Sequence, residues 1–140
     1  MNKILVPFDG SDSAIRAVRY AATLVGSNTT RRLELLYVAN SMPIGTHGTL
    51  SQDQVNERAA AETETTVQAA RRILDDAGIA YQVHTRLGSA ASEITKYAEE
   101  SGCDGIVMGT RGMGPVASAM IGSVATKVVT QVDVPVTLIK

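Results

Sequence analysis

The pattern of hydrophobic and polar positions predicts strands that alternate with helices along the chain. Short apolar runs, typical of buried strands, occupy residues 3–8, 33–39, 104–108 and 134–140. Residues 81–87 alternate apolar and polar positions, which predicts a half-exposed strand near a sheet edge. Apolar residues at helical spacing predict helices over residues 12–25, 51–77, 88–102 and from 122 to the turn at 133. This order favours an α/β fold with a parallel sheet covered by helices on both faces.

The helix predicted over residues 51–77 has clear boundary signals. Ser51 and Gln54 fit a capping box, and Gly78 suits the left-handed residue that often ends a helix. We expect its buried face at Val55, Ala59, Thr66, Ala70, Ile73, Leu74 and Ala77. Its solvated face is expected at the charged residues Glu62, Glu64, Arg71, Arg72, Asp75 and Asp76.

Composition and charge exclude several classes of protein. A chain of 140 residues with 44% hydrophobic and 19% charged residues is ordinary for one globular domain, which we expect to span residues 1–140. The net charge of -1 lacks the basic surplus of nucleic-acid-binding proteins, so no nucleic-acid partner is expected. The single cysteine, Cys103, cannot form an internal disulfide, and the apolar runs are too short for a signal peptide or a membrane span. We therefore expect a soluble cytoplasmic protein.

Candidate binding residues follow three of the predicted strands. In open parallel sheets, ligands bind at the carboxyl ends of the strands, where the crossover direction switches. Asp9 follows the first strand, a long loop follows Val38 of the second, and the glycine-rich residues 109–114 follow the fourth. If the first and fourth strands are neighbours, these loops form one cleft. The glycine-rich segment exposes backbone N–H groups, and Gly122 with Ser123 adds a helix N-terminus and a hydroxyl, so both halves suit a phosphate chain.

These features also have competing interpretations. The glycines could merely turn the chain, and Asp9 could form an Asx turn, bind a ribose or base, ligate a metal with Asp12, or act as a nucleophile. Residues 112–117 match G-x-G-x-x-A, but they follow the fourth strand and include a proline, so we treat this match as fortuitous. The sequence contains no P-loop, no hydrolase elbow and no zinc-ligand spacing. His47 and His84 are interpreted as surface residues.

Two segments resemble those of one known family. The opening Ile4-Leu5-Val6-Pro7-Phe8-Asp9-Gly10-Ser11 is similar to the first strand of the universal stress proteins. Gly109, Gly112, Gly122 and Ser123 fit their G-x2-G-x9-G-[ST] pattern, and the resemblance, which includes Val134-Pro135-Val136, covers the whole chain. It implies a single doubly wound, Rossmann-like domain with five parallel strands in the order 3-2-1-4-5. It also implies an adenine-nucleotide ligand (ATP, AMP or ADP), which Mg²⁺ can accompany.

The resemblance also implies which residues contact the nucleotide. Asp9 would contact the adenosine, Val38 would meet the base through its backbone, and Pro7 and Phe8 would line that end. The segment that follows the ribose and phosphates would comprise Gly109, Thr110, Arg111 and Gly112, and the phosphate tail would be held by Gly122, Ser123 and Val124. The neighbouring Met108 and Ala125 complete the candidate binding residues. Ala125 stands where ATP-binding members often have Ser or Thr, so one hydroxyl that could bind a phosphate is missing. The resemblance therefore does not decide whether ATP or AMP is the preferred ligand.

The implied activity is that of a nucleotide-responsive regulator of the stress response. No residue is a convincing base for activating water, so no catalytic residue is predicted and hydrolysis should be slow at most. Two alternatives stay open: an ATPase or nucleotidyl transferase using the same cleft, and a protein-interaction module whose cleft is empty. The apolar last strand ends at a sheet edge, so we expect a homodimer through Val134 to Ile139.

Overall fold

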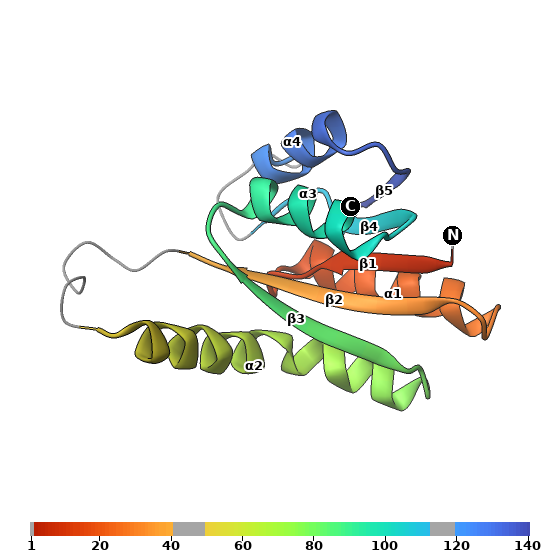
Figure 1. Cartoon of the computed structure of the whole chain (residues 1–140). Coiled ribbons are helices and arrows are strands. Elements are labelled where there is room, and N and C mark those ends of the chain that lie inside the picture. The colour runs from red at the N-terminus through yellow and green to blue at the C-terminus, as the bar shows by residue number, and fades with distance from the viewer. Residues whose placement is uncertain (1, 41–49, 113–119) are drawn as a thin grey trace.

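The computed structural model describes residues 2–40, 50–112 and 120–140 (Figure 1). Its strands and helices alternate in the order β1 (Lys3–Pro7), α1 (Asp12–Gly26), β2 (Arg32–Ala39), α2 (Gln52–Asp76), β3 (Tyr81–Leu87), α3 (Ala90–Ser101), β4 (Gly105–Gly109), α4 (Ser123–Gln131) and β5 (Val136–Ile139). This confirms the alternation predicted from the hydrophobic pattern. The predicted loop at residues 41–48, His47 within it, and the small-residue stretch 113–119 lie outside the described residues.

The strands form one parallel sheet in the order β3-β2-β1-β4-β5. The order 3-2-1-4-5 implied by the family resemblance is therefore confirmed, and β3 lies at an edge as its alternating sequence predicted. The central strand β1 pairs with β2 along its length, from Lys3 opposite Arg32 to Pro7 opposite Leu36. On its other side β1 pairs with β4, and β4 pairs with the second edge strand, β5.

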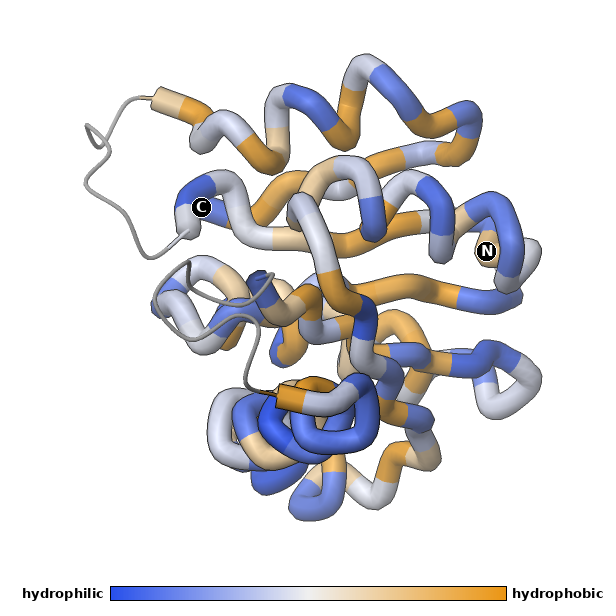
Figure 2. Tube along the Cα trace, turned by 60° about the vertical axis from the view of Figure 1, so that its left-hand side comes forward, coloured by the Kyte–Doolittle hydropathy of each residue, from blue (hydrophilic) through white to orange (hydrophobic). Residues whose placement is uncertain are grey.

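Helices cover both faces of the sheet. In Figure 1, α1 and α2 lie on one side of the sheet, and α3 and α4 lie on the other. Successive side chains of β1 point to opposite faces, so Ile4 and Val6 pack beneath α1 and α2, whereas Leu5 packs beneath α3 and α4. Figure 2 shows the consequence for sequence: inner strands are hydrophobic along most of their length, whereas helices change between hydrophobic and hydrophilic.

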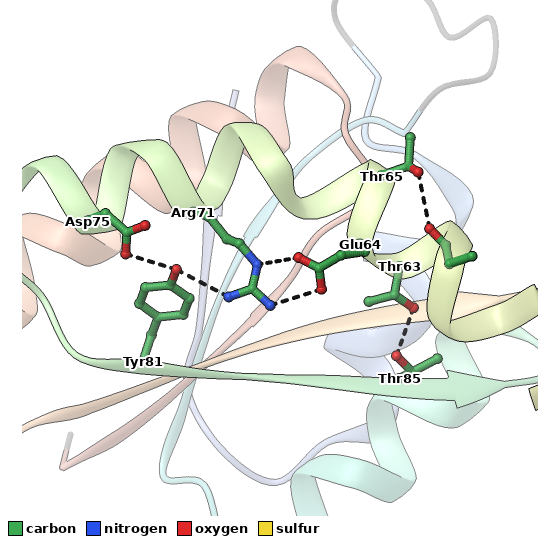
Figure 3. Close-up of polar contacts among 8 residues, drawn as sticks. Thr63, Glu64, Thr65, Arg71, Asp75, Tyr81 and Thr85 are labelled. Carbon is green, nitrogen blue, oxygen red and sulfur yellow. Dashed lines mark hydrogen bonds and ion pairs between the residues drawn. The ribbon is translucent and has the colours of Figure 1, made fainter. Parts of the chain in front are cut away.

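The inner face of α2 confirms the predicted burial of Ala59, Ala70 and Leu74, but Ala77, also predicted there, is exposed. Its buried residues are Ala59, Thr63, Val67, Ala70 and Leu74, whereas Thr66 is only half-buried. Thr63 can be buried because its hydroxyl lies 2.7 Å from the Ala59 carbonyl oxygen. The same hydroxyl lies 2.7 Å from the Thr85 hydroxyl of β3 (Figure 3). The solvated face of the same helix is confirmed, because Glu62, Glu64, Arg72, Asp75 and Asp76 are exposed. Arg71 is half-buried and forms a two-bond ion pair with Glu64.

The crossovers place a switch point between β1 and β4. The chain leaves β1 for α1 on one face of the sheet, whereas it leaves β4 for α4 on the opposite face. The loops after these neighbouring strands therefore diverge and leave a crevice at the carboxyl edge. Among the residues that the structure describes, no helix is both long and apolar enough to cross a membrane.

Candidate functional site

A cavity of about 290 Å³ opens at the carboxyl ends of β1, β2 and β4. Every residue that the sequence resemblance assigned to the site lies in its lining: Pro7, Phe8, Asp9, Val38, Met108, Gly109, Thr110, Arg111, Gly112, Gly122, Ser123, Val124 and Ala125. The structure thus brings together residues from four separate segments of the chain, as expected if the first and fourth strands are neighbours. Their contact with a nucleotide stays a prediction.

The glycines of this site allow close backbone packing. A Cβ atom on Gly109 would lie 2.3 Å from the Ser13 hydroxyl oxygen and 2.8 Å from the Ala14 nitrogen, both in the first turn of α1. On Gly122 it would lie 3.1 Å from the Thr110 carbonyl oxygen. Both glycines therefore have a packing role, and the interpretation that they serve chain geometry holds alongside any role in binding.

Hydrogen bonds fix the backbone of the segment after β4. The Thr110 N–H donates to the Ile139 carbonyl of β5 at 2.8 Å, and the Thr110 carbonyl accepts from the Gly122 N–H. The Arg111 carbonyl accepts from the hydroxyl of Ser13 at 2.6 Å. Elements from three parts of the fold, β5, α4 and α1, therefore hold this wall of the cavity in one conformation.

The N-terminus of α4 presents backbone donors to the cavity. Gly122 is the N-cap residue and offers no side-chain cap, and Ser123, Val124 and Ala125 form the first turn. The first N–H groups of a helix have no acceptor within the helix; here the Thr126 N–H donates to the Gly122 carbonyl at 3.0 Å. These N–H groups and the helix dipole favour an anion at this end of the cavity.

Asp9 lies against the glycine-rich segment at Gly112. One carboxylate oxygen accepts the Ser11 N–H at 2.9 Å, so the Asx turn considered from the sequence is present, and Gly10 within it has a φ of 83°. The other oxygen faces Gly112, where a Cβ atom would lie 3.1 Å from it. This exposed second oxygen can accept a hydrogen bond from a hydroxyl group, such as that of a sugar.

The described residues provide little for a metal ion of their own. Neither Asp9 nor Asp12 belongs to a group of three or more His, Cys, Asp or Glu side chains that could hold a metal, and the described part of the chain contains no such group.

The cavity also has walls that the sequence did not reveal: Ser11, Ala14, Leu36, Tyr37, Ala90 and Ile94. Ala90 and Ile94 come from α3, so assigning them requires knowing which face that helix covers. Tyr37 directly precedes Val38 and could have been included from its place at the end of β2. Burial, followed by the negative charge of Glu62, raises the pKa of the Tyr37 phenol, which therefore stays neutral at physiological pH.

His84 corrects one sequence-based interpretation. Its side chain is only 32% exposed, and its Nε2 atom lies 2.9 Å from the Glu34 carboxylate, so it is not a simple surface residue. Its ring also lies 5.0 Å from that of Tyr97, centroid to centroid. The alternating pattern of β3 did not reveal this environment because Glu34 lies on the neighbouring strand β2. His84 is not among the residues that line the cavity.

The sequence is similar to one described family along its whole length. The model of the Universal stress protein family matches residues 1–140. A universal stress protein of Methanocaldococcus jannaschii is 28% identical over 99% of this chain and 81% of its own length. Another, from Thermus aquaticus, is 31% identical over 98% of this chain and 97% of its own length.

Solved structures share the fold. Universal stress protein UspA of Lactobacillus plantarum superposes with a TM-score of 0.81 at 26% identity, covering 99% of this chain and 97% of its own. A universal stress protein of Archaeoglobus fulgidus, solved in complex with dAMP, gives 0.72 at 23% identity over 100% and 98% of the two chains. An Arabidopsis thaliana family member, solved with AMP bound, gives 0.72 at 18% identity over 100% and 92%.

Proposed function

Because the chain belongs to the universal stress protein family, we propose that residues 1–140 form a domain whose cavity binds an adenine nucleotide and that it acts as a nucleotide-responsive regulator in the stress response. The observation that carries this proposal is the single cavity lined by all thirteen residues assigned from sequence. Family members of Archaeoglobus fulgidus and Arabidopsis thaliana, solved with dAMP and AMP, support the adenine nucleotide as the class of ligand.

The chemistry of the cavity suits a ligand with two unlike ends. Pro7, Phe8, Val38 and Ile94 offer apolar surface for a base, and the second carboxylate oxygen of Asp9 suits a ribose hydroxyl. The N-terminus of α4 suits a phosphate group. Mg²⁺ would reach the site with the phosphates of ATP or ADP.

Fast hydrolysis is not part of this proposal. Asp9 is the carboxylate in the cavity lining, and we place it beside the ribose rather than beside the terminal phosphate. A base that activates water must lie within hydrogen-bond reach of it, close to the terminal phosphate. We therefore assign the bound nucleotide a regulatory role, with slow hydrolysis at most.

The proposed assembly is a homodimer through Val134 to Ile139. β5 is an edge strand of the sheet, and Val136, Thr137, Leu138 and Ile139 are all half-buried within one chain. An edge strand exposes unpaired backbone groups, which a twofold-related β5 would satisfy. Light scattering at micromolar concentrations tests the proposal, and a monomer mass would contradict it.

Thermal unfolding with AMP, ATP or GTP, each with Mg²⁺, tests the binding proposal. A ligand at 100 times its Kd adds about 2.7 kcal/mol to the folded state, which should raise the Tm by roughly 6 to 15 °C. We expect a shift with an adenine nucleotide and none with GTP. Protein freed of copurified nucleotide that shows no shift with AMP or ATP would contradict the proposal.

Substitution of Ser123 by Asp locates the binding site. A carboxylate in the first turn of α4 is favourable for the helix dipole, so the variant should remain folded, yet it should repel a phosphate group. The matched control is Ser51→Asp, because Ser51 is the N-cap residue of α2 and lies outside the cavity lining. We expect Ser123→Asp to lose the nucleotide-induced shift and Ser51→Asp to keep it.

A further inference from the structure

A buried serine outside the cavity contacts its wall. Ser13, in the first turn of α1, is 3% exposed and is not among the residues that line the cavity. Its hydroxyl donates to the Arg111 carbonyl at 2.6 Å and lies 3.4 Å from the Arg111 nitrogen. Ser11 adds a longer hydrogen bond to the same carbonyl, at 3.2 Å, but its hydroxyl also caps α1 at the Ala14 N–H. Ser13 is therefore the principal donor to this carbonyl.

The bond to Ser13 sets the direction of the next N–H group. The C=O of residue 111 and the N–H of residue 112 belong to one peptide plane, and the described chain contains no cis peptide bond. In a trans peptide these two groups point in opposite directions. Because the Arg111 carbonyl is held against α1, the Gly112 N–H must point away from α1. Within the described residues, that N–H makes no hydrogen bond, whereas the neighbouring N–H groups of Thr110 and Arg111 are both bonded.

This peptide needs an external restraint. Glycine has no Cβ atom and permits a wide range of backbone angles, so the 111–112 peptide plane is free to rotate if nothing holds its carbonyl. A rotated peptide would present a carbonyl oxygen where the N–H now points. The second carboxylate oxygen of Asp9 lies 3.1 Å from the Cβ position of Gly112, so an outward carbonyl would add a second negatively polarised oxygen to this wall and disfavour an anion.

We propose that Ser13 is a positioning residue for the anionic part of the ligand. Its hydroxyl holds the Arg111 carbonyl against α1, so the wall presents the Gly112 N–H as a donor instead of a carbonyl acceptor. This inference rests on the proposed nucleotide-binding function, because it assigns Ser13 to that site. It predicts that Ser13 affects a phosphorylated ligand much more than the same ligand without phosphate.

Binding of AMP and adenosine to Ser13→Ala tests this inference. Alanine is a good helix former and removes only the hydroxyl oxygen, so the variant should fold. Isothermal titration calorimetry of the wild type and the variant gives both dissociation constants. We expect the Kd for AMP to rise by about tenfold or more, as for the loss of a hydrogen bond to a charged group, and the Kd for adenosine to change by less than about threefold.

A matched control removes a buried hydroxyl elsewhere. Thr63 is also 3% exposed and is not among the residues that line the cavity. Its hydroxyl bonds the Ala59 carbonyl within α2 and the Thr85 hydroxyl of β3, the latter shown in Figure 3. Thr63→Val should lower stability without changing the ratio of the two dissociation constants. An equal loss of AMP and adenosine binding in Ser13→Ala, or no loss of either, would overturn the role of Ser13.

Amide NMR of the wild type provides a measurement that needs no variant. We expect the Gly112 amide to exchange rapidly without ligand and to shift and become protected when AMP is added. A Gly112 amide that AMP leaves unchanged overturns the inference even when AMP binds. A wild type that binds neither AMP nor adenosine overturns the proposed function, and the inference with it.

Discussion

The Tyr97 phenol of α3 donates a hydrogen bond to the carboxylate of Glu34, which lies on β2 beneath that helix. The Glu34 side chain is only 7% exposed, and two basic groups accompany it: Lys3 Nζ at 3.2 Å and His84 Nε2 at 2.9 Å. A buried carboxylate is costly unless it is paired and hydrogen-bonded. This cluster therefore ties α3, which contributes Ala90 and Ile94 to the cavity, to three strands of the sheet.

Tyr97→Phe should destabilise the protein. The substitution keeps the packing of the ring but removes a donor from a buried charge, which should lower the free energy of unfolding by about 1.5 to 3 kcal/mol. Urea denaturation measures the change. Tyr20→Phe is the control, because Tyr20 is 41% exposed and should tolerate the loss of its hydroxyl. Equal stability of Tyr97→Phe and the wild type would show that the Glu34 carboxylate does not depend on Tyr97.

The same cluster predicts a loss of stability in acid. Burial raises the pKa of Glu34, but the hydrogen bonds from Tyr97 and Lys3 and the charges of Lys3 and His84 outweigh it and lower the pKa below the ordinary 4.5. A lowered pKa in the folded state adds stability above the unfolded pKa, and this stability is lost as pH falls through the folded value. Unfolding free energies should therefore decrease below about pH 4.5.

Glu34→Gln isolates this contribution. The variant should be less stable at neutral pH, but its stability should fall less steeply in acid than that of the wild type. Asp104 also titrates in this range, since the backbone N–H groups of Asn2 and Lys3 lower its pKa. Asp104 is present in both proteins, so subtracting the unfolding free energy of Glu34→Gln from that of the wild type at each pH cancels its contribution. If the unfolding free energies of the two proteins decreased equally as the pH fell, a lowered pKa at Glu34 would be contradicted.

The sequence predicted the fold well because its signals are local. Apolar runs and helical spacing locate each strand and helix, and the residues after parallel strands meet at one edge, which is why Asp9 and Gly109 could be assigned to a common site. Tertiary contacts were not predictable in this way. A charge within the apolar run of β2 does not reveal that Tyr97 and His84 meet Glu34, and a serine in a first helical turn looks like an ordinary polar residue until Arg111 is seen beside it. The burial of Thr63 in α2 was missed for a similar reason, because its partner Thr85 lies on β3.

Gly109→Ala should be strongly destabilising. The new Cβ atom would overlap the Ser13 hydroxyl at 2.3 Å and the Ala14 nitrogen at 2.8 Å, and backbone atoms cannot move aside easily. We expect a loss of about 2 to 4 kcal/mol. Gly26→Ala, at the end of α1, is the control: nothing lies within 4 Å of its Cβ position, and alanine should add up to about 1 kcal/mol there. Chemical denaturation of both variants checks the difference, and a Gly109→Ala protein as stable as the wild type would disprove the close contact with α1.

Arg71→Lys tests the ion pair on the outer face of α2. Arg71 donates two hydrogen bonds to Glu64, at 2.7 and 3.0 Å, and its guanidinium lies 5.8 Å from the centroid of the Tyr81 ring (Figure 3). Lysine cannot form the two parallel bonds, but both partners are partly exposed, so the expected loss is below about 1 kcal/mol. This loss of stability should be smaller at about 0.5 M NaCl, because salt screens exposed charges. Arg72→Lys, at an exposed position of the same helix, should have no effect.

Cys103 should react slowly with thiol reagents in the folded protein. It is the single cysteine of the chain and is 5% exposed, and burial raises the pKa of its thiol. Since the thiolate is the reactive form, both effects lower reactivity at neutral pH. The reaction should then proceed only through transient opening, and we expect a rate at least about 100-fold below that of the unfolded chain. Absorbance measurements with a disulfide reagent, with and without denaturant, give this ratio. Because no other thiol contributes, a folded rate within about tenfold of the unfolded rate would mean that the layer beneath α3 and α4 opens far more readily than its packing implies.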